Sequence, residues 1–127
     1  MMLVRGIRGA TTVRSNSREE ILEATKELLG EIVRRNDLDM DHIASVVFTT
    51  TVDLNAEFPA VAAREMGWTY IALECVHVMN VPGSLPRCIR VLLHVNTEQG
   101  ATDIKHVYLH EAKALRRDLV DASEAEL

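Results

Sequence analysis

The chain has 127 residues, about the length of one domain. Apolar residues make up 47% of it and charged residues 26%, a balance typical of a globular protein rather than of a disordered or collagen-like chain. The net charge of −5 argues against a nucleic-acid partner, because binding to nucleic acid depends on a basic surface. We therefore expect a single folded domain over residues 1–127.

No apolar run approaches the roughly 20 residues that a membrane span needs, and the start of the chain lacks the apolar stretch of a signal peptide. We therefore expect a cytoplasmic protein with no membrane partner. The chain has two cysteines, Cys75 and Cys88. In a reducing compartment both are expected to be free thiols.

The first half of the chain predicts two strands and two helices. Residues 2–8 alternate apolar residues with Arg or Gly, which predicts a strand. Residues 17–35 carry an apolar helical face and begin with the capping-box spacing of Ser17 and Glu20, so a long helix is expected. Residues 43–52 are rich in β-branched residues and favour a buried strand. Pro59 and Gly67 then bracket a short second helix.

The second half predicts three more strands, at residues 70–78, 87–95 and 104–110, with a turn at Pro82, Gly83 and Ser84 between the first two. The charged segment from about residue 112 to 127 is expected to be a mobile tail. This order corresponds to an α+β domain in which two helices cover one face of a mixed β-sheet. The other face is then available for oligomerisation.

Arginines are the side chains that most suggest chemistry. Eleven of the 14 cationic residues are Arg, whose planar fork binds carboxylates in bidentate fashion. Arg90 lies inside an apolar strand, where a charge is costly unless it is paired. Arg90 therefore either forms a buried ion pair or faces a site that receives an anion, and the residues alone leave both interpretations open.

A metal site is the other chemistry to weigh. Cys75 and His77 share one face of their predicted strand, and Cys88 and His94 would approach from the neighbouring strand. Structural zinc sites usually have paired cysteine knuckles, which this sequence lacks, so we expect no metal site and interpret the cysteines as small buried apolar residues. Motifs for hydrolytic nucleophiles and phosphate-binding loops are also absent from the sequence.

Four stretches match a known family in order and at compatible spacing. They are VRGIRGATTV at residues 4–13, FPAVAARE at 58–65, VPGSLPRCIRVLLHVNT at 81–97 and IKHVYLHEAKALRRDL at 104–119. From residue 3 to about 119 the chain resembles the monofunctional bacterial chorismate mutases of the AroH type. The resemblance implies a homotrimeric pseudo-α/β barrel that converts chorismate to prephenate, toward phenylalanine and tyrosine, without a cofactor.

The resemblance also implies an active site in the cleft between adjacent subunits. The positions expected from one subunit are Arg8, Cys75, Arg90, Tyr108 and Leu115, and those from its neighbour are Phe58, Ala60 and Arg64. Arg8 and Arg64 are expected to hold the substrate carboxylates, with Tyr108 close to one of them. Arg90 is expected to reach a carboxylate and the ether oxygen. Arg116 matches a family arginine near the mouth of the site.

Two positions depart from the family pattern. The family typically has a glutamate three residues after Cys75, where it contacts the substrate hydroxyl, but this chain has Val78. A family cation near the start of the second helix is replaced by Val61. The nearby polar candidates are Glu74, His77 and Asn80, and Glu74 would reach the site through a bulge or a one-residue shift.

Three outcomes of the valine substitution remain open: a weaker mutase, a mutase with another hydroxyl ligand, or a relative that binds something else. Two rival functions come from other classes of protein. One is a noncatalytic trimer that binds a dicarboxylate metabolite, and the other is an enamine or imine deaminase-like trimer with a similar barrel.

Overall fold

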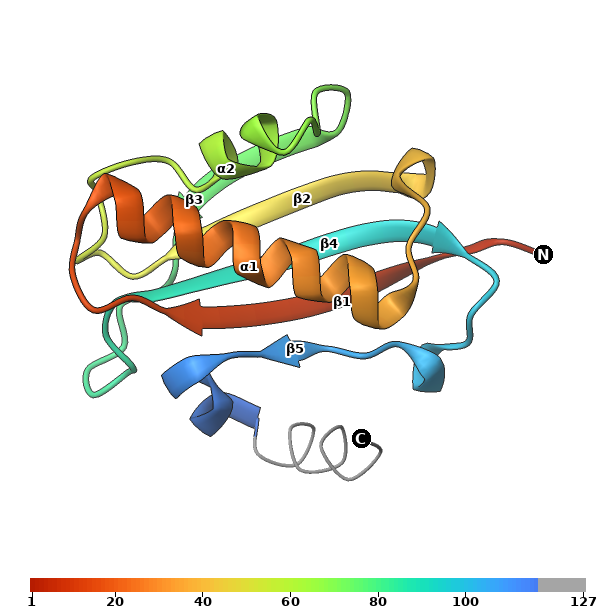
Figure 1. Ribbon diagram of the computed structural model, residues 1–127. Helices are drawn as coiled ribbons and strands as arrows, with labels where there is room; N and C mark the ends of the chain where they lie inside the picture. The colour runs from red at the N-terminus through yellow and green to blue at the C-terminus, as the bar shows by residue number, and fades with distance from the viewer. Residues whose placement is uncertain (117–127) are drawn as a thin grey trace.

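The computed structural model describes residues 1–116 (Figure 1). Its strands are β1 (Leu3–Thr12), β2 (Ile43–Thr50), β3 (Ala72–His77), β4 (Cys88–Thr97) and β5 (Val107–Tyr108). Its helices are α1 (Arg18–Asn36) and α2 (Ala60–Glu65), with short 3-10 helices η1 (Met40–His42), η2 (Ala101–Asp103) and η3 (His110–Arg116). The predicted order of strands and α-helices is confirmed. The 3-10 helices were not predicted.

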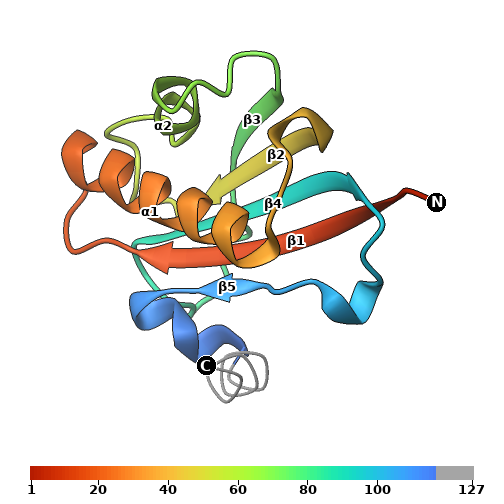
Figure 2. The same ribbon diagram turned by 45° about the vertical axis from the view of Figure 1, so that its right-hand side comes forward.

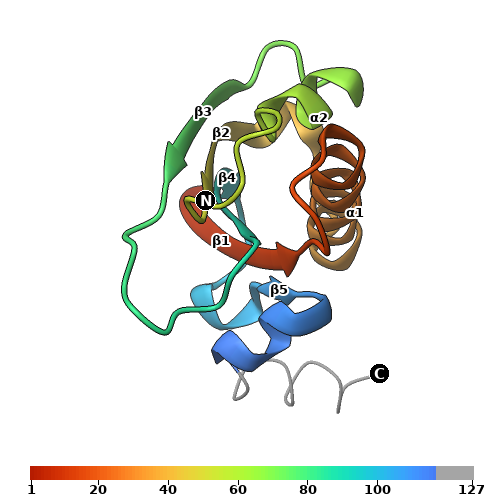
Figure 3. The same cartoon turned by 90° about the vertical axis from the view of Figure 1, so that its left-hand side faces the viewer.

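The five strands form one mixed sheet in the order β3-β2-β4-β1-β5. Strand β4 is antiparallel to both β1 and β2, while β3 runs parallel to β2 and β5 runs parallel to β1. Figure 3 shows both α-helices on one side of the curved sheet, and Figure 2 shows β5 alongside β1 at its edge. The expected α+β class, with two helices on one face, is therefore confirmed.

The expectation that the strands on either side of the Pro82-Gly83-Ser84 turn are neighbours is wrong, because β2 lies between β3 and β4. The chain passes from β2 through α2 to β3, a crossover that sets β3 parallel to β2 at the outer edge. The segment after β3 must then cross back to β4, and it forms the long loop seen in Figure 3.

Helix α1 begins as its sequence predicts. The Ser17 hydroxyl caps the helix by accepting from the Glu20 backbone N–H at 3.2 Å. The Glu20 carboxylate accepts instead from the Arg14 N–H at 3.1 Å, so only one half of the capping box forms. The helix ends at Asp37, whose φ of 49° is left-handed.

Glycine at position 9 sets the distance between α1 and β1. A Cβ atom built there would lie 2.8 Å from Ile32 Cδ1 and 3.1 Å from Leu28 Cδ1. The absence of a side chain on Gly9 therefore lets α1 pack directly onto the strand. The core that results joins Ile7, Phe48 and the other buried apolar residues of the sheet to α1 and α2.

The opposite face of the sheet is only partly covered. A small cluster of Ala10, Cys88, Tyr108 and Ala112, flanked by Leu85 and Leu115, covers one end of it. Elsewhere apolar side chains stay open to solvent, with Val4 at 59%, Val76 at 44% and Leu92 at 39% exposure. We call this surface the helix-free face.

The expected mobile tail falls largely outside the described residues, since residues 117–127 are not described. Residues 112–116 of that tail lie in η3, where Ala112 is buried. Both cysteines are free thiols, as predicted. None of the helices in residues 1–116 is long and apolar enough to cross a membrane.

Candidate active site

Arg90 lies on the helix-free face. Its neighbours along β4, Ile89 and Val91, are buried on the helix-covered side, and alternation along a strand directs Arg90 the other way. In register it stands between Thr49 of β2 and Ala10 of β1. The central position of β4 thus holds a guanidinium rigidly on the open surface of the sheet.

The guanidinium of Arg90 lacks the ion pair that was one of its two interpretations. Within residues 1–116 no carboxylate lies within ion-pair distance of it, and its Nε is buried without a hydrogen-bond partner. It acts on the nearby Cys88 thiol, whose pKa is raised by burial and lowered in part by the Arg90 charge. A buried, unsatisfied Nε on a cation favours the second interpretation, a site that receives an anion.

Arg8 lies on the same face as Arg90, opposite Leu92 in the β1–β4 register. Its backbone N–H donates to Nδ1 of His106 at 2.9 Å. The pKa of His106 is lowered by burial and by the positive charges of Arg8 and Arg116, so the ring is neutral at neutral pH with Nδ1 as acceptor. His106 thus fixes the strand position that carries Arg8.

The remaining residues expected from this subunit gather at the same end of the sheet. Tyr108 pairs with Ala10 across β5 and β1 and is buried in the small cluster that Leu115 flanks. Arg116 acts electrostatically on His106 and therefore belongs to this group. We call the group the arginine half-site. Its members are Arg8, Arg90, Tyr108, Leu115 and Arg116.

A second group lies on β3 and around α2, beside a cavity of about 380 Å³ between β3 and the segment before α2. Phe58, 65% exposed, and Cys75 both line it. The pKa of the Cys75 thiol is raised by burial, against smaller lowering effects of the Ala60 N–H and the Arg64 charge, so the thiol is neutral at neutral pH. We call this group the pocket half-site. Its members are Phe58, Ala60, Arg64 and Cys75.

Cys75 and Arg90, which are expected from one subunit, lie on opposite faces of the sheet in this chain. Cys75 is in register with Phe48, which faces the helices, and it packs against the core. Arg90 is in register with Thr49, one residue along β2, and so lies on the other face. The thiol beside Arg90 is Cys88.

The bulge that would have brought Glu74 to the Cys75 face is absent. The β2–β3 register runs without a shift and pairs Glu74 with Val47 on the helix-free face. The Val78 N–H donates to the Thr50 carbonyl at 2.8 Å, which prolongs the ladder past β3. Glu74 therefore does not belong to the pocket half-site.

The four residues considered for a metal site are divided between the two faces of the sheet. Cys75 and His77 are in register with Phe48 and Thr50 on the helix-covered face. Cys88 and His94 lie on the helix-free face, where His94 Nδ1 is 3.2 Å from Ser45 Oγ. The described residues contain no group of three or more His, Cys, Asp or Glu side chains placed to hold a metal ion.

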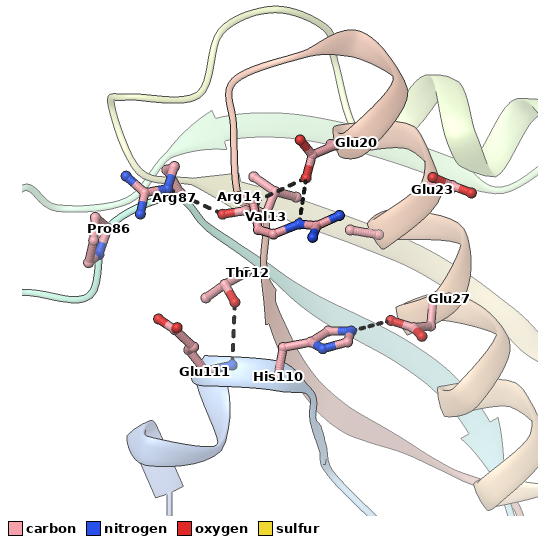
Figure 4. A pocket seen from close by; sticks show the side chains of 11 residues that line it. Thr12, Val13, Arg14, Glu20, Glu23, Glu27, Pro86, Arg87, His110 and Glu111 are labelled. Carbon is pink, nitrogen blue, oxygen red and sulfur yellow. Dashed lines mark hydrogen bonds and ion pairs between the residues drawn. The ribbon is translucent and has the colours of Figure 1, made fainter.

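A cavity of about 830 Å³ lies apart from these groups, between α1, the end of β1 and the start of η3 (Figure 4). Glutamates outnumber arginines in its lining, which holds Glu20, Glu23, Glu27 and Glu111 against Arg14 and Arg87. Arg14 lies 3.9 Å from a Glu20 oxygen, and His110 Nε2 lies 2.8 Å from Glu27. Because carboxylates prevail in this cavity, it suits an organic dianion less well than the surface around Arg90 does.

Arg8, Arg64 and Arg90 share a feature that sets them apart from the arginines of α1. None of the three has a carboxylate within ion-pair distance in residues 1–116. By contrast, Arg34 and Arg35 both pair with Glu31, at 2.6 and 2.9 Å. Both half-sites thus present cations available to an anionic ligand.

Sequence and structure comparisons agree on one family. The profile described as chorismate mutase type I matches residues 4–119. The chain is 43% identical to chorismate mutase AroH of Bacillus subtilis (strain 168), over 99% of this chain and 100% of that protein. It is 46% identical to chorismate mutase AroH of Thermus thermophilus, over 94% of this chain and 99% of that protein.

A solved structure gives the same result. The chorismate mutase Cth-682 from Clostridium thermocellum superposes with a TM-score of 0.86 at 55% identity, covering 87% of this chain and 98% of that one. The matches span nearly the whole chain and include both half-sites. This chain belongs to the chorismate mutase type I family.

Proposed function

We propose that this protein is an isomerase that rearranges chorismate to prephenate, in sites shared between the subunits of a homotrimer. The observation that carries the proposal is Arg90, a cation on a rigid strand with a buried Nε that no described residue satisfies. The relatives named chorismate mutase support the choice of substrate. The reaction would place the protein in the shikimate pathway, on the branch toward phenylalanine and tyrosine.

The reaction itself explains which groups the site requires. In this [3,3] rearrangement the ether C–O bond breaks while a new C–C bond forms, and six electrons move around one ring without any proton transfer. The ether oxygen becomes the ketone oxygen of prephenate and gains negative charge as its bond breaks. The protein must therefore hold a folded conformer and stabilise that oxygen.

The arginines suit both tasks. Arg90 would donate to the ether oxygen and to one carboxylate, and a preorganised donor of this kind lowers the barrier by about 3 to 4 kcal/mol. Arg8 and Arg64 would bind the substrate carboxylates through their planar forks. Tyr108 and Leu115 would close the apolar wall beside them, since both pack in one small cluster.

Association of subunits would bring the two half-sites together. In one chain the arginine half-site lies on the helix-free face, whereas Cys75 of the pocket half-site lies on the opposite face of the sheet. The apolar side chains Val4, Val76 and Leu92 are exposed on the helix-free face, and association of subunits would bury them. We infer that the pocket half-site of one subunit meets the arginine half-site of its neighbour.

A turnover assay tests the proposal. Purified protein is incubated with chorismate, and both the loss of chorismate and the appearance of prephenate are followed. We expect Arg90→Ala to lower kcat at least about a hundredfold, and Arg90→Lys to recover part of the loss because it restores charge without the fork. Arg34→Ala, an exposed ion-paired position on α1, is the matched control and should leave kcat unchanged.

Near-normal turnover by Arg90→Ala would show that the role given to Arg90 is wrong. The replacement of the family's hydroxyl-binding glutamate by Val78 favours one rival function, a noncatalytic binder of a dicarboxylate. Saturable binding of chorismate without turnover would identify the protein as a noncatalytic dicarboxylate binder. The deaminase-like alternative has no observation in its favour.

A further inference from the structure

His77 occupies a position in the pocket half-site that the family comparison does not assign. Alternation along β3 places it on the same face as Cys75, and both side chains line the cavity of about 380 Å³ together with Phe58. Val78, where the family has its glutamate, does not line this cavity. The ring of His77 is therefore the imidazole that a ligand in this cavity would meet.

The contacts of His77 favour one tautomer. Nδ1 lies 3.3 Å from the Thr50 carbonyl oxygen and 3.2 Å from Thr50 Oγ1. A carbonyl oxygen can only accept, so the contact with it favours a proton on Nδ1. The Thr50 hydroxyl in turn donates to the Leu54 carbonyl and is free to accept from the ring. In the neutral ring Nε2 is then an acceptor, and no described residue hydrogen-bonds to it.

The other polar side chains of the cavity are already engaged. Glu57 accepts from Arg18 at 3.0 Å and from the Phe58 N–H at 2.9 Å. The Asn55 oxygen accepts from Asn16 at 2.8 Å. Glu74 is on the other face of the sheet. Among the described residues that line the cavity, His77 Nε2 is thus the acceptor best placed for a ligand.

We propose that Nε2 of His77 accepts a hydrogen bond from the ring hydroxyl of the substrate, in place of the carboxylate that Val78 cannot supply. The inference rests on the proposed function. A neutral Nε2 with an unshared lone pair repels a carboxylate and attracts an O–H donor, so this end of the site selects the hydroxyl-bearing end of the substrate. The two carboxylates are left to the arginines.

The test compares chorismate with an analogue that lacks only the ring hydroxyl. We expect the wild type to prefer chorismate in kcat/KM by about 10- to 100-fold, the range of one hydrogen bond to substrate. His77→Phe should lose that preference, so that chorismate and the analogue then have similar kcat/KM values. His77→Gln, which keeps an acceptor, should retain part of the preference.

Two further variants separate a direct contact from a structural effect. His77→Phe combined with Val78→Glu should recover part of the preference for chorismate, because the carboxylate returns. His42→Phe, on η1 beside a different cavity, is the matched control and should behave as wild type. Unfolding midpoints of all variants show whether the fold is kept.

Each outcome is decisive. If the wild type turns over chorismate and the analogue equally well, or if His77→Phe keeps the full preference, the role of His77 is wrong and the proposed function stands. If the wild type does not turn over chorismate at all, the proposed function fails and the role of His77 fails with it.

Discussion

His106 shows how one side chain can prepare another residue for its role. Its Nδ1 accepts the Arg8 backbone N–H at 2.9 Å, and the two residues are 98 positions apart in the chain. Burial and the charges of Arg8 and Arg116 lower its pKa from the ordinary 6.5. The neutral ring is thus needed to hold Arg8, and a proton on Nδ1 would break the bond.

The lowered pKa has a consequence for stability. As pH falls below 6.5 the unfolded chain takes up the proton before the folded protein does, so the contribution of His106 is complete above 6.5 and is lost progressively down to its folded pKa. We expect His106→Asn, which keeps an acceptor but does not titrate, to lose less stability than wild type between pH 7 and pH 5. Urea unfolding at each pH, at fixed protein concentration, measures this, and equal losses would contradict it.

At the level of single residues, the sequence predicted which side chains belong to the candidate site better than it predicted the groups that those side chains contact. Arg90 was recognised as costly because a charge inside an apolar strand is visible locally. Whether a carboxylate pairs with the Arg90 charge depends on residues far away in the chain, so the answer requires the folded structure. His106 left no local signal, because its partner is a backbone N–H.

At the level of elements, the contact between α1 and β1 depends on the missing side chain of Gly9. The nearest atoms to a Cβ at that position belong to Ile32, Leu28 and Val91, at 2.8 to 3.2 Å. All three are buried core side chains, so they must repack to admit a methyl group at position 9.

Gly9→Ala is therefore expected to lower the free energy of unfolding by about 1 to 3 kcal/mol, the usual range for overpacking a core. Gly30→Ala is the matched control, because Gly30 lies inside α1 with no atom within 4 Å of its Cβ position. There alanine should stabilise by about 1 kcal/mol through helix propensity. Chemical denaturation at fixed protein concentration measures both, and a neutral or stabilising Gly9→Ala would contradict the packing described.

Element types could be predicted from the chain, whereas strand neighbours could not. Apolar patterning, β-branched residues and the bracketing Pro and Gly marked the helices and strands, since all these signals depend on residues close in sequence. Pairing depends on distant residues, and the sequence therefore placed β3 beside β4 although β2 lies between them. The segment after residue 8 reads from the sequence as a connecting loop or an extension of the strand, and pairing with distant residues decides for the extension, which continues β1 to Thr12 opposite Cys88.

At the level of the whole molecule, the two proposed half-sites lie on different faces of one sheet. Cys75 is in register with Phe48 of β2, and Arg90 is in register with the next residue, Thr49. Successive strand residues face opposite sides of a sheet, so Cys75 of the pocket half-site and Arg90 of the arginine half-site are separated. The family resemblance supplied the candidate site residues, while strand alternation places Cys75 with the pocket half-site rather than with the arginine half-site. Only an assembly of copies would complete either site.

Complementation between two inactive variants tests the shared site most directly. Arg90→Ala damages the arginine half-site, and Arg64→Ala damages the pocket half-site. When the two proteins are mixed and allowed to exchange subunits, random assembly should pair undamaged halves in about a quarter of the sites, restoring about a quarter of wild-type kcat. If the mixture never exceeds the mean activity of the two variants measured separately, the halves belong to one subunit and the proposed shared site is wrong.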